Sequence, residues 1–304
     1  MTALVLPRFV MPDPWRLLRP LKLDGQWSPR QRVQFQDADP GVHSIGPDPY
    51  YEDKNVYEIA TGLGLSSGLK LALDAGAASS YASGQSWLDL TANGYDFFRG
   101  STGSTESTDP TFNGSSGGLS LSEYWSSDGG DYFTYDSSNE TWMNKLHKNN
   151  AKYSILVGLY HGDTLGIPYA LFVTQNAGGN SVGISVWIQN YGLIWRWGNG
   201  TSGGSKGHNT ISNDRYTIAG VSVDESSATG GWAMANGDFT NFNPTYTSPS
   251  TASSAATLSI GSFEGLYPMP SAAKYYFVLA WEGVALSKSQ MTAAYNALRL
   301  RLGI

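Results

Sequence analysis

The chain has 304 residues, a formal net charge of −6 at pH 7 and only 14% charged residues, together with 36 glycines, 18 tyrosines and 10 tryptophans. Few charges and many glycines and aromatic residues argue against a long helical protein and favour strands joined by turns. The absence of cysteine excludes disulfides and thiolate chemistry, and the acidic balance argues against non-specific nucleic-acid binding.

The first 61 residues differ in composition from the rest. Eight of the 14 prolines lie among the first 49 residues, yet the same stretch is rich in leucine and aromatic residues, which is not typical of a disordered tail. Residues 1–32 also hold six basic and two acidic side chains. We therefore predict that residues 1–61 form an extended arm that docks on another chain, with packing against its own domain as the alternative. The expected contact residues of the arm are Arg8, Phe9, Trp15, Arg16, Arg19 and Trp27.

Residues 62–304 have the pattern of one β domain. Apolar residues alternate over 69–73, 184–188 and 193–197, and each alternation predicts a strand. The near-continuous apolar run YYFVLAW at 275–281 predicts a strand buried on both faces. Asn-Gly and Gly-Gly pairs between the runs predict tight turns. Many short strands at this spacing favour a sandwich or a jelly roll.

A single helix is predicted at the C-terminus. The sequence SKSQ beginning at Ser287 has the form of a capping box. Apolar residues then recur at helical spacing from Met291 to Leu302, and Gly303 provides a stop signal. We expect this helix to pack on the sandwich.

Five motifs occur in the order found in one known family. They are LKLALDAGAASSYASGQSWLDLTANGYDFFRG at 69–100, SSDGGDYFTYD at 126–136, GWAMANGDF at 231–239, LSIGSF at 258–263 and FVLAWEGVALSKSQMTAAYNALRLRLGI at 277–304. Together they resemble the laminin G-like, concanavalin A-like lectin domains of bacterial and bacteriophage proteins. The resemblance implies an all-β, concanavalin A-like jelly-roll sandwich over 62–304. The chain departs from the family pattern at Ala92 and Phe97 and in a long loop at 101–118.

Calcium is a candidate ligand, because sandwiches of this kind often bind it through loop oxygens. Two clusters of the required oxygen ligands occur in the sequence. They are Asp89, Asn93 and Asp96, and Asp128, Asp131 and Asp136. The alternative is turn chemistry, in which Asp and Asn side chains bond to the nearby backbone without an ion.

Carbohydrate is the ligand most natural to the resemblance, because sugar rings stack on aromatic side chains. The richest aromatic stretch is WIQNYGLIWRWGN at 187–199. Alternation along it predicts that Trp195 and Trp197 share one face of a strand. These two rings either bind sugar or belong to the core. The candidate sugar-binding residues are Trp187, Gln189, Tyr191 and Arg196.

Catalysis is not predicted. Glucanases of this fold carry E-x-D-x-x-E or E-x-D-x-E on one strand, and the chain has neither run. No G-x-S-x-G run sits in a strand–turn–helix context, and no metalloprotease histidine pair occurs. The sequence therefore predicts that the chain is not an enzyme, and glycoside hydrolysis is kept as an alternative.

The arm and the lectin-like domain together favour a structural protein of a bacteriophage particle. The apolar stretch at residues 3–6 is cut by Pro7, so no signal peptide is predicted. We expect assembly in the host cytoplasm into a homo-oligomer that docks on other virion proteins through the arm, as a head decoration or fibre or a tail fibre. The sandwich would then contact host glycans. The alternative is a free carbohydrate-binding module of a bacterial surface or secreted protein.

Overall fold

The computed structural model describes residues 51, 53–162, 168–176, 180–211, 216–263 and 265–304. These residues belong to one compact unit that extends from Pro47 to Ile304. The predicted boundary between residues 61 and 62 falls inside this unit. The predicted arm contacts Arg8, Phe9, Trp15, Arg16, Arg19 and Trp27 lie outside the described residues.

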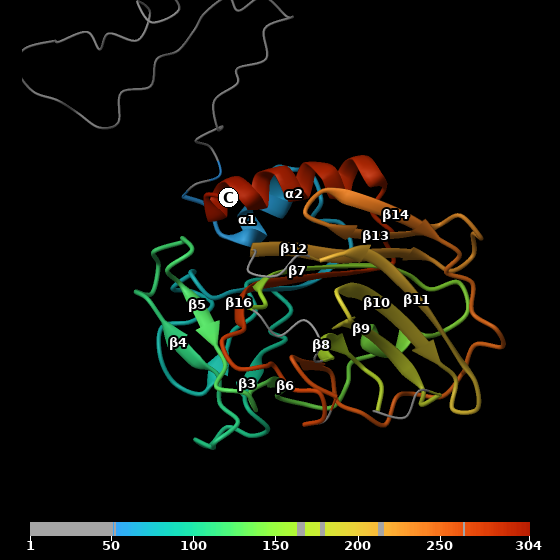
Figure 1. Cartoon of the computed structure of the whole chain (residues 1–304), viewed down its shortest axis with the longest axis horizontal. Coiled ribbons are helices and arrows are strands. Elements are labelled where there is room, and N and C mark those ends of the chain that lie inside the picture. The colour runs from blue at the N-terminus through green and yellow to red at the C-terminus, as the bar shows by residue number, and fades with distance from the viewer. Residues whose placement is uncertain (1–50, 52, 163–167, 177–179, 212–215, 264) are drawn as a thin grey trace, which may run out of the picture. The chain divides into compact units, whose positions relative to one another are not determined.

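Within the described residues, two eight-stranded antiparallel sheets make up the domain (Figure 1). The first sheet has the order β14-β13-β12-β7-β16-β5-β4, with β1 also paired to β16. Its strands are β1 (Leu69–Asp74), β4 (Thr111–Asn113), β5 (Tyr124–Ser126), β7 (Lys152–Tyr160), β12 (Tyr216–Asp224), β13 (Gly231–Ala235), β14 (Asp238–Phe242) and β16 (Lys274–Glu282).

The second sheet has the order β11-β10-β9-β8-β15-β6-β3-β2. Its strands are β2 (Ser86–Trp87), β3 (Phe97–Arg99), β6 (Phe133–Tyr135), β8 (Tyr169–Val173), β9 (Gly183–Gln189), β10 (Gly192–Gly198), β11 (Gly203–Thr210) and β15 (Ser259–Ile260). The prediction of an all-β jelly-roll sandwich with a C-terminal helix is therefore confirmed.

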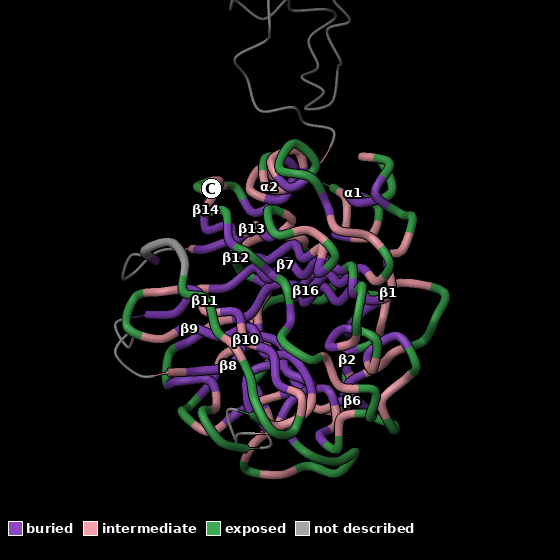
Figure 2. Tube along the Cα trace, turned by 90° about the vertical axis from the view of Figure 1, so that its right-hand side faces the viewer, coloured by how far each residue is buried: buried purple, intermediate pink, exposed green. Residues whose placement is uncertain are grey.

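The main core lies between the two sheets, where buried segments of both run side by side (Figure 2). Alternation along β7 explains how the core is built, because Ile155 and Val157 belong to this core while Leu156 points to the opposite face. The strand β16 is buried on both faces, as its apolar run predicts. Its Phe277 ring occupies the space where any side chain at Gly158 would lie, so these two strands require glycine at that position.

Two helices cover the other face of the first sheet. Helix α1 (Val56–Gly62) and helix α2 (Lys288–Leu302) pack there around Leu156 and Phe277. The predicted capping box of α2 is present, with the backbone N–H of Gln290 donating to Ser287 Oγ at 3.3 Å. Helix α1 was not predicted, although it too begins with a capping box. Neither described helix has the length and apolarity that a membrane crossing requires.

Candidate functional site

The outer face of the second sheet brings together three of the four predicted sugar-binding residues. In the β9–β10 pairing, Trp187 lies opposite Ile194 and Ser185 lies opposite Arg196. Side chains alternate along a strand, so Trp187, Gln189 and Arg196 share one face. The other face of these strands points into the main core.

Trp187, one of the candidate sugar-binding residues, is buried. Only 6% of this residue is accessible, because side chains from elsewhere cover it. The Arg196 guanidinium carbon lies 4.9 Å from the centre of its ring. The ring centres of Phe263 and Tyr267 lie 5.8 and 6.2 Å from it. Alternation along β9 correctly places Trp187 on the outer face of the sheet. It does not show that Phe263 and Tyr267, more than seventy positions later in the chain, cover the ring.

We define the outer-face patch as Trp187, Ile194, Arg196, Phe263 and Tyr267. Trp187 and Phe263 form its buried base. Arg196 is half-buried and Tyr267 is 45% exposed, so these two side chains meet solvent. The patch therefore presents to solvent a phenol ring and a guanidinium group, each of which packs against the Trp187 ring.

Backbone strain accompanies the exposed ring of Tyr267. Its φ is +51°, in the left-handed region that residues other than glycine seldom adopt. The conformation is fixed by a tight turn in which Phe263 and Leu266 exchange backbone hydrogen bonds of 2.7 and 2.9 Å, and by a 3.2 Å bond from the Ala170 amide to the Tyr267 carbonyl. Strain at an exposed aromatic residue is a feature that clusters at functional sites.

Tyr191 has the same character at another turn. It is 46% exposed and has a φ of +66° in the turn between β9 and β10. The Ile211 amide donates to its carbonyl at 2.7 Å. The sequence identified Tyr191 through its place in a turn, whereas it gave no comparable signal for Tyr267.

Trp195 and Trp197 belong to the core, as the alternative interpretation held. Their exposed fractions are 1% and 4%. The Trp195 indole donates to the Tyr153 hydroxyl at 2.7 Å, and its ring stacks on Tyr246 at 5.8 Å. These rings are not available to a ligand.

The side chains of the first candidate calcium cluster form hydrogen bonds to nearby backbone groups. The Asp89 carboxylate accepts hydrogen bonds from the amides of Ala72, Thr91 and Tyr95 at 2.9 to 3.2 Å. Asp96 accepts from the Asp89 amide at 2.8 Å, and the Asn93 side chain donates to a backbone carbonyl. These contacts are those of turn chemistry.

The second candidate cluster does not come together. Asp131 accepts from the Asp128 amide at 3.1 Å, whereas the Asp136 amide bonds to the Asp96 carbonyl, which belongs to the other cluster. Burial, with the nearby Asp128 charge, raises the pKa of Asp131 to about 6. In the part of the chain that the structure describes, no three acidic or histidine side chains are arranged to hold a metal ion.

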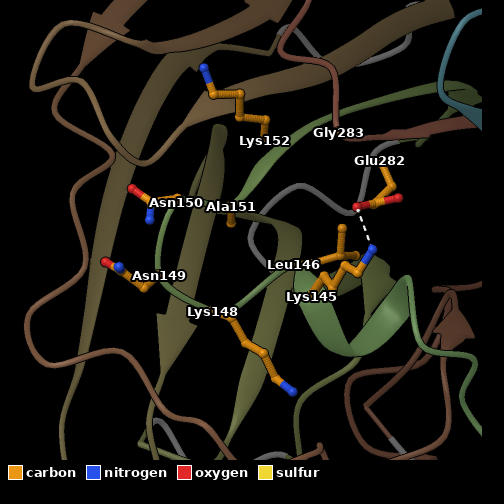
Figure 3. A pocket seen from close by; sticks show the side chains of 9 residues that line it. All are labelled: Lys145, Leu146, Lys148, Asn149, Asn150, Ala151, Lys152, Glu282 and Gly283. Carbon is orange, nitrogen blue, oxygen red and sulfur yellow. Dashed lines mark ion pairs between the residues drawn. The ribbon is translucent and has the colours of Figure 1, made fainter.

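A cavity of about 440 Å³ lies where η2 (Met143–Lys145) and the following loop meet the adjoining ends of β7 and β16 (Figure 3). The sequence analysis did not identify it, although the segment KLHKNNAK at 145–152 is unusually basic for this chain. Its lining residues are Lys145, Leu146, Lys148, Asn149, Asn150, Ala151, Lys152, Glu282 and Gly283.

Comparisons with known proteins show the fold. No protein-family model and no curated protein matches the sequence. The structure is similar to Trypanosoma rangeli sialidase in complex with sialic acid, with 12% identity and a TM-score of 0.51, over 78% of this chain and 34% of that chain. It is also similar to the botulinum neurotoxin serotype D binding domain, with 11% identity and a TM-score of 0.52, over 75% of this chain and 51% of that chain.

The chain therefore spans about a third of the sialidase and half of the toxin domain that it matches. At these identities the similarity establishes an all-β sandwich of the kind found in both. The predicted kinship with bacteriophage proteins stays a prediction.

The prediction that the chain is not an enzyme is wrong as an inference from this fold, because the similar structures include sialidases, which are glycoside hydrolases. The prediction relied on the missing carboxylate run. Sialidases use a tyrosine nucleophile rather than the usual pair of carboxylates, so a missing run does not exclude hydrolysis.

Proposed function

We propose that the chain binds carbohydrate through the outer-face patch. The observation that carries the proposal is the exposed Tyr267 ring, held in a left-handed turn against the Trp187 ring, on which Arg196 also packs. A sugar ring stacks its apolar face on an aromatic side chain, while charged and amide groups bond to its hydroxyls.

Preorganisation supports the same conclusion. Arg196 rests on the Trp187 ring, so less side-chain entropy is lost when its guanidinium bonds to a ligand. Gln189 lies on the same face and supplies an amide. Similarity to a toxin receptor-binding domain and to a sialidase is consistent with recognition of a surface glycan.

A glycan array with the full chain tests the proposal. We expect selective binding that falls at least tenfold in Tyr267→Asn and in Arg196→Gln. Asparagine tolerates the left-handed conformation, so Tyr267→Asn removes the ring without adding backbone strain. The matched control is Leu88→Asn, which changes an exposed apolar residue beside β2, at the opposite edge of the same sheet. Equal binding by all four proteins would refute the proposal.

Incubation of the bound glycans with the full chain separates recognition from hydrolysis. Release of reducing ends by the native chain, but not by a heat-denatured sample, would show that the chain also hydrolyses the glycans. Intact glycans after prolonged incubation would leave a binding function alone.

We further propose that residues 1–46 attach the domain to a virion built in the host cytoplasm, where the sandwich is displayed towards the host surface. The basic and aromatic composition of residues 1–32 supports this role. Light scattering should find an oligomer for the full chain and a monomer for a chain starting at Pro47. Two monomers would instead favour a free carbohydrate-binding module.

A further inference from the structure

The strands that carry Trp187 and Arg196 lie in a part of the chain without carboxylates. Residues 164–213, which include β8 to β11, contain neither aspartate nor glutamate, although the chain has 25 acidic residues. These four strands are neighbours in the second sheet, from the edge strand β11 to β8 (Figure 1). In the turn that covers Trp187, the single acidic residue is Glu264, which lies outside the described residues. The four strands thus offer Arg196 no counter-ion.

Arg196 is held by an aromatic ring and not by a carboxylate. Its guanidinium carbon lies over the Trp187 ring, 4.9 Å from the ring centre. Among the residues that the structure describes, none forms an ion pair or a hydrogen bond with this guanidinium. A cation–π contact uses no N–H donor, so the five donors of the group remain available. The half-buried side chain therefore presents a positioned but unpartnered cation to solvent.

The neighbouring strand β11 supplies a hydroxyl and open space. Ser205 lies directly opposite Arg196 in the β10–β11 pairing, so both side chains share the outer face. Ser205 is exposed. Gly207 lies on the same face two positions later, and a methyl group at this position would meet no atom within 4 Å. A ligand can therefore approach over β11 and bond to both the guanidinium and the hydroxyl.

Tyr267 can take part in the same contact. The Arg196 guanidinium carbon and the Tyr267 ring centre lie 4.9 and 6.2 Å from the Trp187 ring. Because both groups pack on one indole, a glycan of two or three sugar units can span them. The exposed Tyr267 ring then offers a stacking surface, and Arg196 offers a charge.

We propose that the outer-face patch selects glycans that carry a carboxylate, which binds to Arg196 and Ser205 while a sugar ring stacks on Tyr267. The inference rests on the proposed carbohydrate-binding function and adds the class of sugar. A guanidinium binds a carboxylate through two parallel N–H···O bonds, a geometry that a single neutral hydroxyl cannot match. No existing ion pair of Arg196 with a described residue has to be broken when the ligand binds.

Calorimetric titration of the full chain tests this assignment. The probes are sialyllactose and a trimer of galacturonic acid, each compared with its carboxyl-reduced counterpart, and acetate serves as a simple anion. Reduction of the carboxyl group removes the charge and keeps the sugar skeleton. We expect at least one acidic glycan to bind at least tenfold more tightly than its reduced counterpart and than acetate.

Variants on β10 and β11 test the roles of the residues. Arg196→Gln should weaken binding of the acidic glycan at least tenfold and that of the reduced counterpart far less. Arg196→Lys keeps the charge but loses the two parallel bonds, so a three- to tenfold loss is expected. Ser205→Ala should cost about two- to tenfold. The matched control is Lys206→Gln, which removes one positive charge on the opposite side of the same strand and should change nothing.

Urea denaturation of each variant checks that it folds. If Arg196→Gln is unfolded, Arg196→Lys retains the cation on the Trp187 ring and still tests the inference. A loss of acidic-glycan binding in Lys206→Gln as large as in Arg196→Gln would mean that net charge alone decides, and it would overturn the inference.

The outcomes separate this inference from the proposed function. Equal affinity for acidic and reduced glycans, equal loss of both in Arg196→Gln, or equally tight binding of acetate would each overturn the inference. If Tyr267→Asn still abolishes glycan binding in those cases, the proposed function stands and the carboxylate preference falls. Binding that is lost in Tyr267→Asn, together with an acidic preference that is lost in Arg196→Gln, supports both. If no glycan binds, both fall.

Discussion

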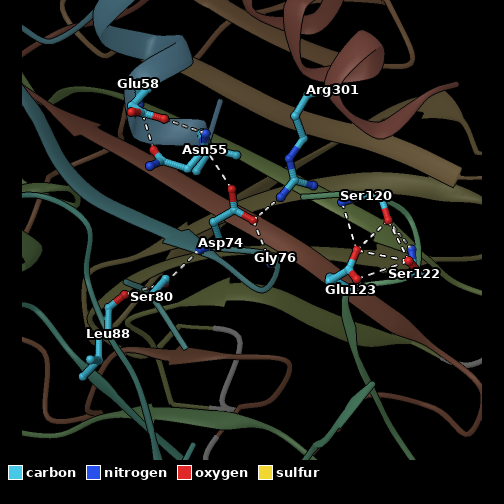
Figure 4. Close-up of polar contacts among 11 residues, drawn as sticks. Asn55, Glu58, Asp74, Gly76, Ser80, Leu88, Ser120, Ser122, Glu123 and Arg301 are labelled. Atoms are coloured by element: carbon cyan, nitrogen blue, oxygen red, sulfur yellow. Dashed lines mark hydrogen bonds and ion pairs between the residues drawn. The ribbon is translucent and has the colours of Figure 1, made fainter. Parts of the chain in front are cut away.

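Asp74 at the end of β1 and Arg301 in the last turn of α2 form an ion pair in which both side chains are completely buried, although 227 positions separate them (Figure 4). The same carboxylate accepts hydrogen bonds from the amides of Val56 and Gly76, each at 3.0 Å. One side chain thus connects the first turn of α1, the end of β1 and the C-terminal helix. A buried carboxylate requires such partners, because it has lost its hydration.

Removing Arg301 should destabilise the domain strongly, since it leaves Asp74 charged and buried. We expect Arg301→Met to lower the free energy of unfolding by about 3–5 kcal/mol. The double variant Asp74→Asn/Arg301→Met should recover part of this loss, because it removes the unpaired charge. Urea denaturation measures both, and an Arg301→Met variant within 1 kcal/mol of the parent would contradict the prediction.

The Tyr153 hydroxyl is expected to matter despite its distance from any surface. It accepts the Trp195 indole hydrogen bond at 2.7 Å and lies 3.1 Å from the Tyr246 hydroxyl. Tyr153→Phe leaves the buried Trp195 N–H without its partner and should cost about 1–3 kcal/mol of stability. Tyr57→Phe, on the partly exposed surface of α1, is the control and should have no measurable effect. Thermal or urea unfolding followed by tryptophan fluorescence reports the difference.

Asp131 should make stability depend on pH. Its pKa is raised to about 6 in the folded state from 3.8, chiefly by burial, so the folded chain retains a proton that the unfolded chain has released. Its contribution to stability is therefore full below about pH 4, falls as pH rises towards 6 and is absent above that. Asp131→Asn keeps an acceptor for the Asp128 amide and should be more stable than the parent by roughly 1–3 kcal/mol at pH 8. Urea denaturation of both proteins at pH 4 and pH 8 tests the prediction. An equal difference in the free energy of unfolding between Asp131→Asn and the parent at the two pH values would exclude this role.

Helix α1 should be required for the stability of the sandwich. Val56, Ile59 and Ala60 are at most 2% exposed, and the Val56 amide bonds to Asp74. A chain that starts at Leu63 should lose about 3–6 kcal/mol relative to one that starts at Pro47, because this apolar surface and hydrogen bond are lost. Denaturation midpoints compare the two chains, and equal midpoints would show that α1 is dispensable.

The sequence predicted the elements whose signal is local. Alternation located β1, β9 and β10, a near-continuous apolar run located β16, and a capping box located α2. Helix α1 has the same kind of cap at Asn55 and Glu58, but it is short and directly follows a proline-rich stretch. Strands of two or three residues, such as β2 and β15, have too few positions for a period to be seen.

The candidate sites depend on contacts between distant segments, which explains why they were only partly predicted. The turn at 263–267 covers Trp187, and no sequence pattern in that turn predicts an exposed ring at Tyr267. The cavity likewise needs the antiparallel pairing of β7 with β16 to bring Lys152 close to Glu282 and Gly283.

Strand β16 pairs with β7 and, on its other side, with both β1 and β5. On the ribosome, β1 therefore emerges about 200 residues before its partner, which corresponds to roughly 10–40 s at ordinary rates of translation. Throughout that interval the apolar segment LKLALD lacks its partner strand β16. Completion of the first sheet is accordingly delayed until β16 has been synthesised, after which α2 places Arg301 on Asp74.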